Sequence, residues 1–338
     1  MYQPVHFRKA KKIWFMGRYV DWPRAFVHSM SHALHYGNSV FEGIRAYPTA
    51  AGPAVFRLPE HIDRLLLSAR TIKMTPPYDR EQIIEAVLKT LRLNKLRSAY
   101  IRPLFFYSYG NLGLVPKFSP VELLIGAWEW GAYLGDKTEK GVTTYIVPWR
   151  RIHYSQLDMR AKLGGMYVLS TINGLVAREH GCDEAIFLNL EGRVAEGPGE
   201  NIFIVKKGVL QTNALTESIL EGINRTSLLE IAADRGIPTR VAPIRLKDLF
   251  NADEAFFSGT AVEVAPIVQV TDGSNPKKPG KTRTIGSGRR GEITQLLAET
   301  FRDAVCGKLP EYEKWLTYVD KKAGRRSASP RRKGRSST

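Results

Sequence analysis

One lysine of this chain stands in an unusual setting. Lys162 lies in the segment 160–167 (RAKLGGMY), among small and apolar neighbours and just before a predicted helix. Most lysines are solvated surface charges, but the two glycines after Lys162 would let the backbone approach a bulky group. A desolvated lysine has a lowered pKa and can attack a carbonyl group as a nucleophile. This segment alone is a weak indication of carbonyl chemistry.

A second segment, 194–203 (VAEGPGENIF), contains a turn at 197–199 that presents Glu196, Glu200 and Asn201. It could be an ordinary polar hairpin loop. Alternatively, a buried glutamate here could face the ring nitrogen of a pyridine cofactor. A carboxylate in that place keeps the nitrogen protonated, which makes the ring an electron sink.

Two further segments offer donors for anions. Segment 219–226 (ILEGINRT) predicts a turn through Gly222 into a helix that begins near Ile223 or Asn224. The amides at a helix start bind phosphate readily, although an ordinary Asn-capped helix gives the same pattern. Segment 257–263 (FSGTAVE) predicts a strand that breaks at 258–259 into a small-residue turn. Its hydroxyls and amides could bind another phosphate edge or a carboxylate.

The elements that must position these residues fall into two halves. Apolar side chains at helical spacing predict helices over 60–72 and 81–93. Two further helices are expected over 166–180 and 224–235, each closed by a glycine, and a last one near 292–305. Asn94 is the expected left-handed stop of the second helix. Strands are predicted over 12–17, 98–108, 121–131, 142–147, 184–190, 202–209 and 254–270, with a strand pair in 35–47 and a surface loop over 272–291. We expect an α+β protein with a small N-terminal domain (1–135), a linker (136–141) and a larger domain (142–320).

Charge and cysteine content narrow the class of protein. The net charge is +17, but residues 321–338 hold eight Lys or Arg and no acid, so residues 1–320 carry +9. This tail has no large apolar residue to bury, which predicts disorder, and it could bind nucleic-acid phosphates or have no partner. No apolar run is long enough to span a bilayer. With two distant cysteines and no secretory signal, we expect a cytoplasmic protein with reduced thiols.

Taken together, the order and spacing of these segments are specific. With SHALHYGNSVFEGIRAY at 31–47, EHIDRL at 60–65, SAYIRPL at 98–104 and WGAYLG at 130–135, they resemble the fold-type IV pyridoxal-phosphate enzymes. Within these, the chain resembles the branched-chain amino-acid aminotransferases over about 13–315. The resemblance implies a small α/β domain, a larger β-barrel-like domain with helices, and pyridoxal 5'-phosphate as cofactor. It also implies a homodimer or larger homo-oligomer, with the loop near 110–114 reaching into the partner's site.

The resemblance also implies roles for individual residues. Lys162 would form the Schiff base with the cofactor and then shuttle the proton, and Glu196 would pair with the pyridinium. The remaining cofactor contacts would come from Tyr167 at the phenolic oxygen and from Arg64, Ile223, Asn224 and Thr260 at the phosphate. The substrate would meet Tyr36, Phe41, Tyr100, Arg102, Trp130, Tyr133 and Ala261. The implied reaction is amino-group exchange between L-leucine, L-isoleucine or L-valine and 2-oxoglutarate, giving branched-chain 2-oxo acids and L-glutamate.

Other functions remain open at this point. A D-amino-acid or (R)-amine aminotransferase, or a lyase, would keep the fold and the cofactor, and a nucleic-acid-binding protein would use the basic tail. The loop 109–116 has Leu114 where many relatives have methionine, close to where specificity is set. The GxGxxG match at 286–291 follows a charged loop with too little chain after it for a dinucleotide fold. The histidines show no metal-ligand spacing, so we expect no metal site.

Overall fold

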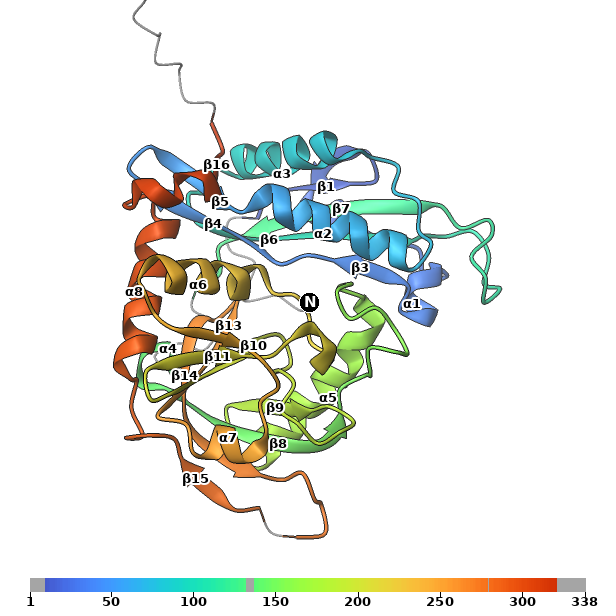
Figure 1. Ribbon diagram of the computed structural model, residues 1–338. Helices are drawn as coiled ribbons and strands as arrows, with labels where there is room; N and C mark the ends of the chain where they lie inside the picture. The colour runs from blue at the N-terminus through green and yellow to red at the C-terminus, as the bar shows by residue number, and fades with distance from the viewer. Residues whose placement is uncertain (1–9, 132–136, 279, 321–338) are drawn as a thin grey trace, which may run out of the picture.

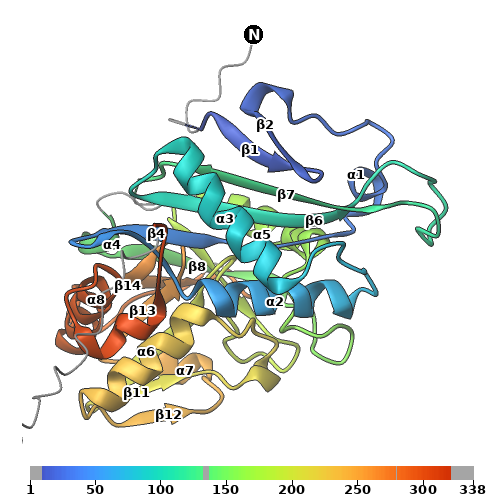
Figure 2. The same cartoon turned by 90° about the horizontal axis from the view of Figure 1, so that it is seen from above.

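Two eight-stranded sheets organise the chain. The computed structural model describes residues 10–131, 137–278 and 280–320. Predictions for Tyr133 and for the basic tail 321–338 therefore lie outside the described residues, as does part of the expected linker. Figures 1 and 2 show the first sheet with its two long helices lying against the second sheet and its helices.

The first sheet is antiparallel throughout and comes mostly from the first half of the chain. Its strand order is β16-β5-β4-β6-β7-β1-β2, and β3 pairs with β6. The strands are β1 (Lys12–Phe15), β2 (Arg18–Asp21), β3 (Ser39–Phe41), β4 (Ile44–Thr49), β5 (Gly52–Phe56), β6 (Ala99–Tyr107), β7 (Val121–Trp128) and β16 (Leu316–Tyr318). The last of these comes from near the end of the chain and closes the edge beside β5.

Two long helices, α2 (Leu58–Thr71) and α3 (Arg80–Asn94), pack on this sheet (Figure 1). The buried residues Leu58, Ile62, Leu65 and Ala69 of α2 recur every three or four positions, so one apolar face meets the strands. This packing creates the first core, and it aims the other side chains of α2 at the second half of the molecule. The short elements here are α1 (His32–Tyr36) and the 3-10 turn η1 (Trp22–Arg24).

The second sheet mixes parallel and antiparallel pairs. Its order is β12-β11-β10-β13-β14-β8-β9, and β15 pairs with β14. The strands are β8 (Val142–Arg150), β9 (Glu184–Leu188), β10 (Asn201–Lys206), β11 (Val209–Thr212), β12 (Thr239–Val241), β13 (Glu254–Gly259), β14 (Glu263–Asp272) and β15 (Thr282–Thr284). Every residue of β9 is buried, and so is every residue of β10 except the last, because both faces of these strands are covered.

Helices from the second half cover this sheet. α5 (Tyr167–Glu179) packs on β8 and β9, whereas α6 (Ile223–Asp234) and α8 (Glu292–Val305) pack together over β13. The remaining elements are α4 (Lys137–Lys140), α7 (Leu246–Phe250), η2 (Gly164–Met166), η3 (Leu215–Glu217) and η4 (Pro310–Trp315). None of the helices in the described ranges is long and apolar enough to cross a membrane.

Four local predictions need correction. Asn94 is the last residue of α3 and is buried with its side chain bonded to backbone groups, so Lys95, with φ 52°, makes the left-handed stop instead. The strand predicted to break at 258–259 runs through Gly259 because both residues pair with β14. The expected loop 272–291 contains β15, which pairs with β14. The strand pair expected over 35–47 begins only at Ser39, after α1.

Candidate active site

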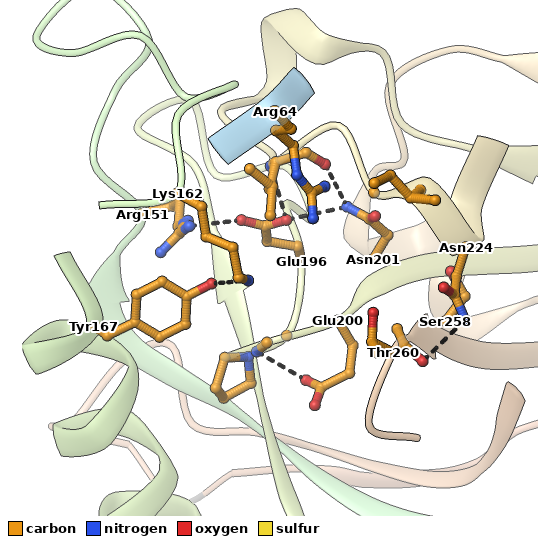
Figure 3. Close-up of a pocket in the computed structure, with 17 residues that line it drawn as sticks. Arg64, Arg151, Lys162, Tyr167, Glu196, Glu200, Asn201, Asn224, Ser258 and Thr260 are labelled. Atoms are coloured by element: carbon orange, nitrogen blue, oxygen red, sulfur yellow. Dashed lines mark hydrogen bonds and ion pairs between the residues drawn. The ribbon is translucent and has the colours of Figure 1, made fainter. Parts of the chain in front are cut away.

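Two adjoining cavities lie where the sheets meet, and Lys162 borders both of them. The inner cavity is polar and is drawn in Figure 3. The outer cavity, of about 590 Å³, has a more apolar wall. The first sheet supplies Phe41, Tyr100 and Arg102 to the outer cavity, and the second half supplies Thr260 and Ala261. The site therefore needs both halves of the chain.

The backbone around Lys162 is fixed by the first sheet and α2. Its amide donates to Ser68 Oγ at 2.9 Å, and its carbonyl accepts from the amide of Phe41 at 3.2 Å. A Cβ at Gly164 would collide with Ser39 Oγ, so the glycine after Leu163 permits this close approach. The side chain is half-buried, and its Nζ donates to Tyr167 Oη at 2.6 Å (Figure 3). A lysine held in this way can meet a carbonyl group at a defined point.

Glu196 lies opposite Lys162 at the buried end of the inner cavity. Its Oε1 pairs with Arg151 Nη2 at 2.8 Å, and its Oε2 accepts from Asn201 Nδ2 at 3.1 Å and from the Leu220 amide at 3.0 Å. Burial raises the pKa of Glu196, and Arg151 opposes that shift. The result is a rigid buried carboxyl group that can accept a hydrogen bond from a cationic partner.

The other end of the inner cavity is the start of α6. Its N-cap is Gly222, with φ −71° and ψ 130°, and no side chain caps the helix. Asn224 therefore does not cap α6, and the alternative of an ordinary Asn-capped helix is wrong. The Nδ2 of Asn224 donates instead to the Gly259 carbonyl at 3.2 Å. A Cβ at Gly222 would collide with Asn201 Oδ1. The first amides of α6, beside Ser258 and Thr260, lie at the positive end of the helix, which is an arrangement that can bind an anion.

Arg64 reaches the start of α6 from α2 and is held by a buried cluster. Its Nε and Nη2 donate to Glu42 at 2.6 and 2.8 Å, and its Nη1 donates to the Glu221 carbonyl at 2.7 Å. His61 Nδ1 lies 2.8 Å from the same Glu42 carboxylate. Burial alone would raise the pKa of Glu42, but Arg64 and His61 hold it well below its ordinary value. The fixed guanidinium contributes a positive charge at the wall of the cavity.

Aromatic side chains and one arginine build the wall of the outer cavity. Tyr100 and Trp130 meet edge to face, with ring centroids 4.5 Å apart. Arg102 Nη2 donates to Tyr100 Oη at 2.9 Å, and its guanidinium carbon lies 4.6 Å from the centre of the Phe41 ring. This wall can bury an apolar side chain while it keeps one cation available for a polar group.

Two buried acids, Glu184 and Glu200, also border the outer cavity. Each accepts a hydrogen bond from a neighbouring backbone amide, Ala185 for Glu184 and Gly199 for Glu200. Burial, with the neighbouring Glu184 carboxylate, raises the pKa of Glu200 to about 8. Burial also raises the pKa of Glu184. Both shifts favour the protonated form of these two acids over the ionised form.

The structure gathers most residues that the sequence predicts for the site. The two cavities are bordered by Phe41, Arg64, Tyr100, Arg102, Trp130, Lys162, Tyr167, Glu196, Ile223, Asn224, Thr260 and Ala261. Tyr36 is not among the bordering residues of these cavities; it is exposed, and its hydroxyl donates to the Leu112 carbonyl at 2.9 Å. Tyr133 falls outside the described residues. The roles themselves stay predictions.

Sequence reasoning missed several residues of the site. Arg151 and Ser258 border the inner cavity, and Glu42 holds Arg64 from just after β3. Ser258 lies in the segment 257–263, which the sequence marks as a candidate anion site. Arg151 directly follows Arg150, and the sequence carries no signal that shows which of the two arginines faces the cavity. Glu42 lies in the FEG of 41–43, where it gives no spacing signal because its partners are far along the chain.

The inner cavity fits a phosphorylated pyridine aldehyde. Buried polar atoms at its wall have no hydrogen-bond partner within the described residues, among them Ser258 Oγ and Arg151 Nε and Nη1. A phosphate suits the α6 amides and Arg64, a ring cation suits Glu196, and a carbonyl carbon suits Lys162. In the part of the chain that the structure describes, no cluster of His, Cys, Asp and Glu side chains could hold a metal ion.

Comparison with known proteins places the chain in a family. The pattern of the family described as amino-transferase class IV matches residues 39–270. The chain is similar to the branched-chain-amino-acid aminotransferase of Pseudomonas aeruginosa, with 43% identity over 91% of this chain and 97% of that one. It is also similar to the crystal structure of the T.th. branched-chain amino acid aminotransferase complexed with N-(5'-phosphopyridoxyl)-L-glutamate, with a TM-score of 0.85 and 41% identity over 92% and 99% of the chains. The same enzyme complexed with 4-methylvaleric acid gives a TM-score of 0.85 and 42% identity over 92% and 99%.

A lysine beside a buried carboxylate, in a cavity that ends at the uncapped start of a helix, is an arrangement suited to amino-group chemistry. The chain belongs to the class IV aminotransferases. This confirms the predicted family, the α+β fold class, transamination as the reaction type and pyridoxal phosphate as the cofactor.

Proposed function

We propose that this enzyme exchanges amino groups between L-leucine, L-isoleucine or L-valine and 2-oxoglutarate, with L-glutamate as the other product. The observation that carries the proposal is the aromatic wall of Phe41, Tyr100 and Trp130 beside Lys162. Burial of a branched side chain contributes about 0.8 kcal/mol per CH₂. Such a wall separates leucine, isoleucine and valine only weakly, so all three should be substrates.

The inner cavity would hold the cofactor through groups at its two ends. The amides of Ile223 and Asn224, with Arg64 and Thr260, would bind the phosphate, and Glu196 would pair with the ring nitrogen. When bound, pyridoxal phosphate supplies a cationic ring that accepts the electron pair left by removal of the α-proton. Tyr167, 2.6 Å from Lys162 Nζ, would fix the ring's phenolic oxygen beside the lysine.

Lys162 would carry the proton in the reaction. Its tether keeps Nζ close to the reacting carbon, which makes the transfer effectively intramolecular. Tyr100 Oη and the amides of Thr260 and Ala261 would orient the substrate carboxylate. Arg102, which holds Tyr100 Oη at 2.9 Å, would also meet the side-chain carboxylate of glutamate in the second half-reaction.

A second copy of the chain would complete the site. Large apolar side chains are exposed on the loop between β6 and β7 (Leu114, Val115, Phe118) and on α5 (Val168, Leu175). Because Tyr36 bonds to Leu112 of this loop, we propose that Tyr36 enters the partner's outer cavity together with the loop. Light scattering should give a dimer or a larger assembly. Leu114→Asp with Phe118→Asp should yield monomers with weakened substrate binding, and Lys206→Asp, on another surface, should not. A monomeric parent protein would contradict this assembly.

The first experiment is an absorption spectrum of the purified protein before and after addition of L-leucine or D-leucine. We expect a visible band from the lysine-bound cofactor, changed by L-leucine and not by D-leucine, and absent from Lys162→Ala. A response to the D-enantiomer alone would favour a D-amino-acid aminotransferase of the same fold. A protein that takes up no pyridoxal phosphate would overturn the proposal. The cytoplasmic location and a nucleic-acid contact of the tail stay predictions.

A further inference from the structure

Arg151 is brought to the inner cavity by an irregularity in the second sheet. The parallel register between β8 and β9 shifts between Ile146 and Arg150, and just after β8 the Arg151 amide donates to the Leu188 carbonyl at 2.9 Å. Consecutive residues of a regular strand point to opposite faces, so such a shift decides which of two adjacent arginines faces the cavity. Arg151 is 6% exposed and points to Glu196 beside Lys162 (Figure 3).

The hydrogen bonds of Glu196 leave little of its carboxylate unused. A carboxylate has about four acceptor positions, two on each oxygen. Oε2 fills its pair with Asn201 Nδ2 and the Leu220 amide, and Oε1 accepts from Arg151. One position therefore remains, on the oxygen that Arg151 holds.

The three groups bonded to the Glu196 carboxylate are all hydrogen-bond donors, and this arrangement favours the ionised form over the protonated acid. A protonated carboxyl would need an acceptor for its own hydrogen, and the arrangement offers that hydrogen only donors. We propose that Arg151 is a positioning residue for amino transfer: it holds Glu196 in the ionised form and directs its last acceptor position to a cationic ring nitrogen. This inference rests on the proposed cofactor site and adds to it a residue without an assigned role.

The charges around Glu196 support this role. Burial raises the pKa of Glu196, while Arg151, the Leu220 amide and Lys162 lower it. Glu196 in turn helps to raise the pKa of Glu200, and it opposes the lowering of the pKa of Arg225 by burial. Arg151 makes the only direct ion pair with Glu196 in the described part of the chain, so its removal leaves burial to favour the protonated acid.

The test compares Arg151→Met, Arg151→Lys, Glu196→Gln and the double variant Arg151→Met/Glu196→Gln. The readouts are the dissociation constant of pyridoxal phosphate, from spectral titration of the cofactor-free protein, and kcat and KM for L-leucine. For Arg151→Met we expect roughly 10- to 100-fold weaker cofactor binding, the range for loss of one charged hydrogen bond, and a lower kcat with little change in KM. Arg151→Lys should recover part of both, because it restores the charge.

The double variant separates positioning from simple bracing of the fold. Once Glu196 is glutamine there is no ionised form to hold, so adding Arg151→Met should change cofactor binding by less than about threefold. If the double variant instead shows the product of the two single-variant changes in the dissociation constant of pyridoxal phosphate, the proposal is wrong. Arg193→Met is the matched control, because Arg193 pairs with buried Glu217 at 2.6 Å and does not border either cavity.

The remaining outcomes also distinguish a positioning role of Arg151 from a structural one. If Arg151→Met and Arg193→Met lower the melting temperature equally and neither changes cofactor binding, Arg151 is only structural. If Arg151→Met does not fold, the comparison of Arg151→Lys with the parent gives the same decision. Failure of the parent protein to bind pyridoxal phosphate would instead contradict the proposed function, so the two failures are distinguishable.

Discussion

Arg45 Nη1 lies 2.8 Å from Glu263 Oε1, and this ion pair joins the two sheets. Arg45 belongs to β4, and Glu263 is the first residue of β14. The Nη2 of Arg45 also donates to the carbonyls of Trp130 and Gly131, where the chain leaves the first sheet. One guanidinium thus links the turn that carries Thr260 to the aromatic wall of the outer cavity.

Replacement of Arg45 by methionine should loosen this link. Both side chains are largely buried, so the Glu263 carboxylate would be left without its cation, at a cost of about 1–3 kcal/mol. For a protein of this size we expect a fall in melting temperature of several degrees, together with a raised KM for L-leucine. Lys206→Met removes an exposed pair with Asp253 and should change neither value measurably. An unchanged KM for Arg45→Met would show that the link does not position the substrate.

Replacement of Glu42 by glutamine should weaken cofactor binding. Glu42 fixes Arg64 through two hydrogen bonds, and glutamine can accept only one of them. We expect the dissociation constant of pyridoxal phosphate to rise about 10-fold or more, measured by spectral titration. Pyridoxal without its phosphate should show a smaller change, because Arg64 acts at the phosphate end. Glu60→Gln, which disturbs only a half-exposed pair with Arg57, serves as the control.

Replacement of Gly43 by alanine should impair substrate binding. A Cβ at this position would collide with the Tyr100 hydroxyl, which Arg102 holds at 2.9 Å. Displacement of Tyr100 should raise KM for L-leucine roughly tenfold, the equivalent of about 1.4 kcal/mol, with little effect on cofactor binding. Gly174→Ala is the control in the same cavity, because a Cβ there meets nothing within 4 Å. Equal KM values in both variants would contradict the assigned position of Tyr100.

Replacement of Glu200 by glutamine should change the pH dependence of stability. The pKa of Glu200 is raised from its ordinary 4.5 to about 8, so the folded protein keeps a proton that the unfolded chain releases. The contribution of this proton to the free energy of unfolding is complete below the pKa of Glu200 in the unfolded chain. It is lost as the pH rises through the pKa of Glu200 in the folded protein. Between about pH 5 and pH 9 the parent should lose more stability than Glu200→Gln, which stays neutral.

Melting curves across that range would check the Glu200 prediction. The exposed Glu299→Gln should follow the parent at every pH. Parallel curves for the parent and Glu200→Gln would mean that Glu200 is ionised in the folded protein throughout.

The sequence determined the elements with a regular period and the residues with local signals. Helix α2 lies within two residues of the range that its apolar spacing predicts, and the glycine-rich segments around Lys162 and Glu196 mark positions where backbone approaches closely. The family resemblance then predicted phosphate-binding and substrate-binding residues, and most of these border the two cavities. The predicted end of α3 was wrong, because the Asn94 side chain accepts long-range hydrogen bonds from the amides of Lys11 and Lys12 and Lys95 makes the left-handed stop.

Only the tertiary structure decided which distant groups meet. A register shift between β8 and β9 brings Arg151 to the inner cavity. Glu42 contacts Arg64 because α2 packs beside the end of β3. Tyr36 does not border either cavity of its own chain, and its hydroxyl bonds instead to the loop after β6. Such contacts depend on how sheets and helices pack, and packing leaves no periodic trace in the sequence. The residues alone therefore predicted which segments could do chemistry. The pKa values of Glu196 and Glu200, in contrast, depend on burial and on neighbours far along the chain.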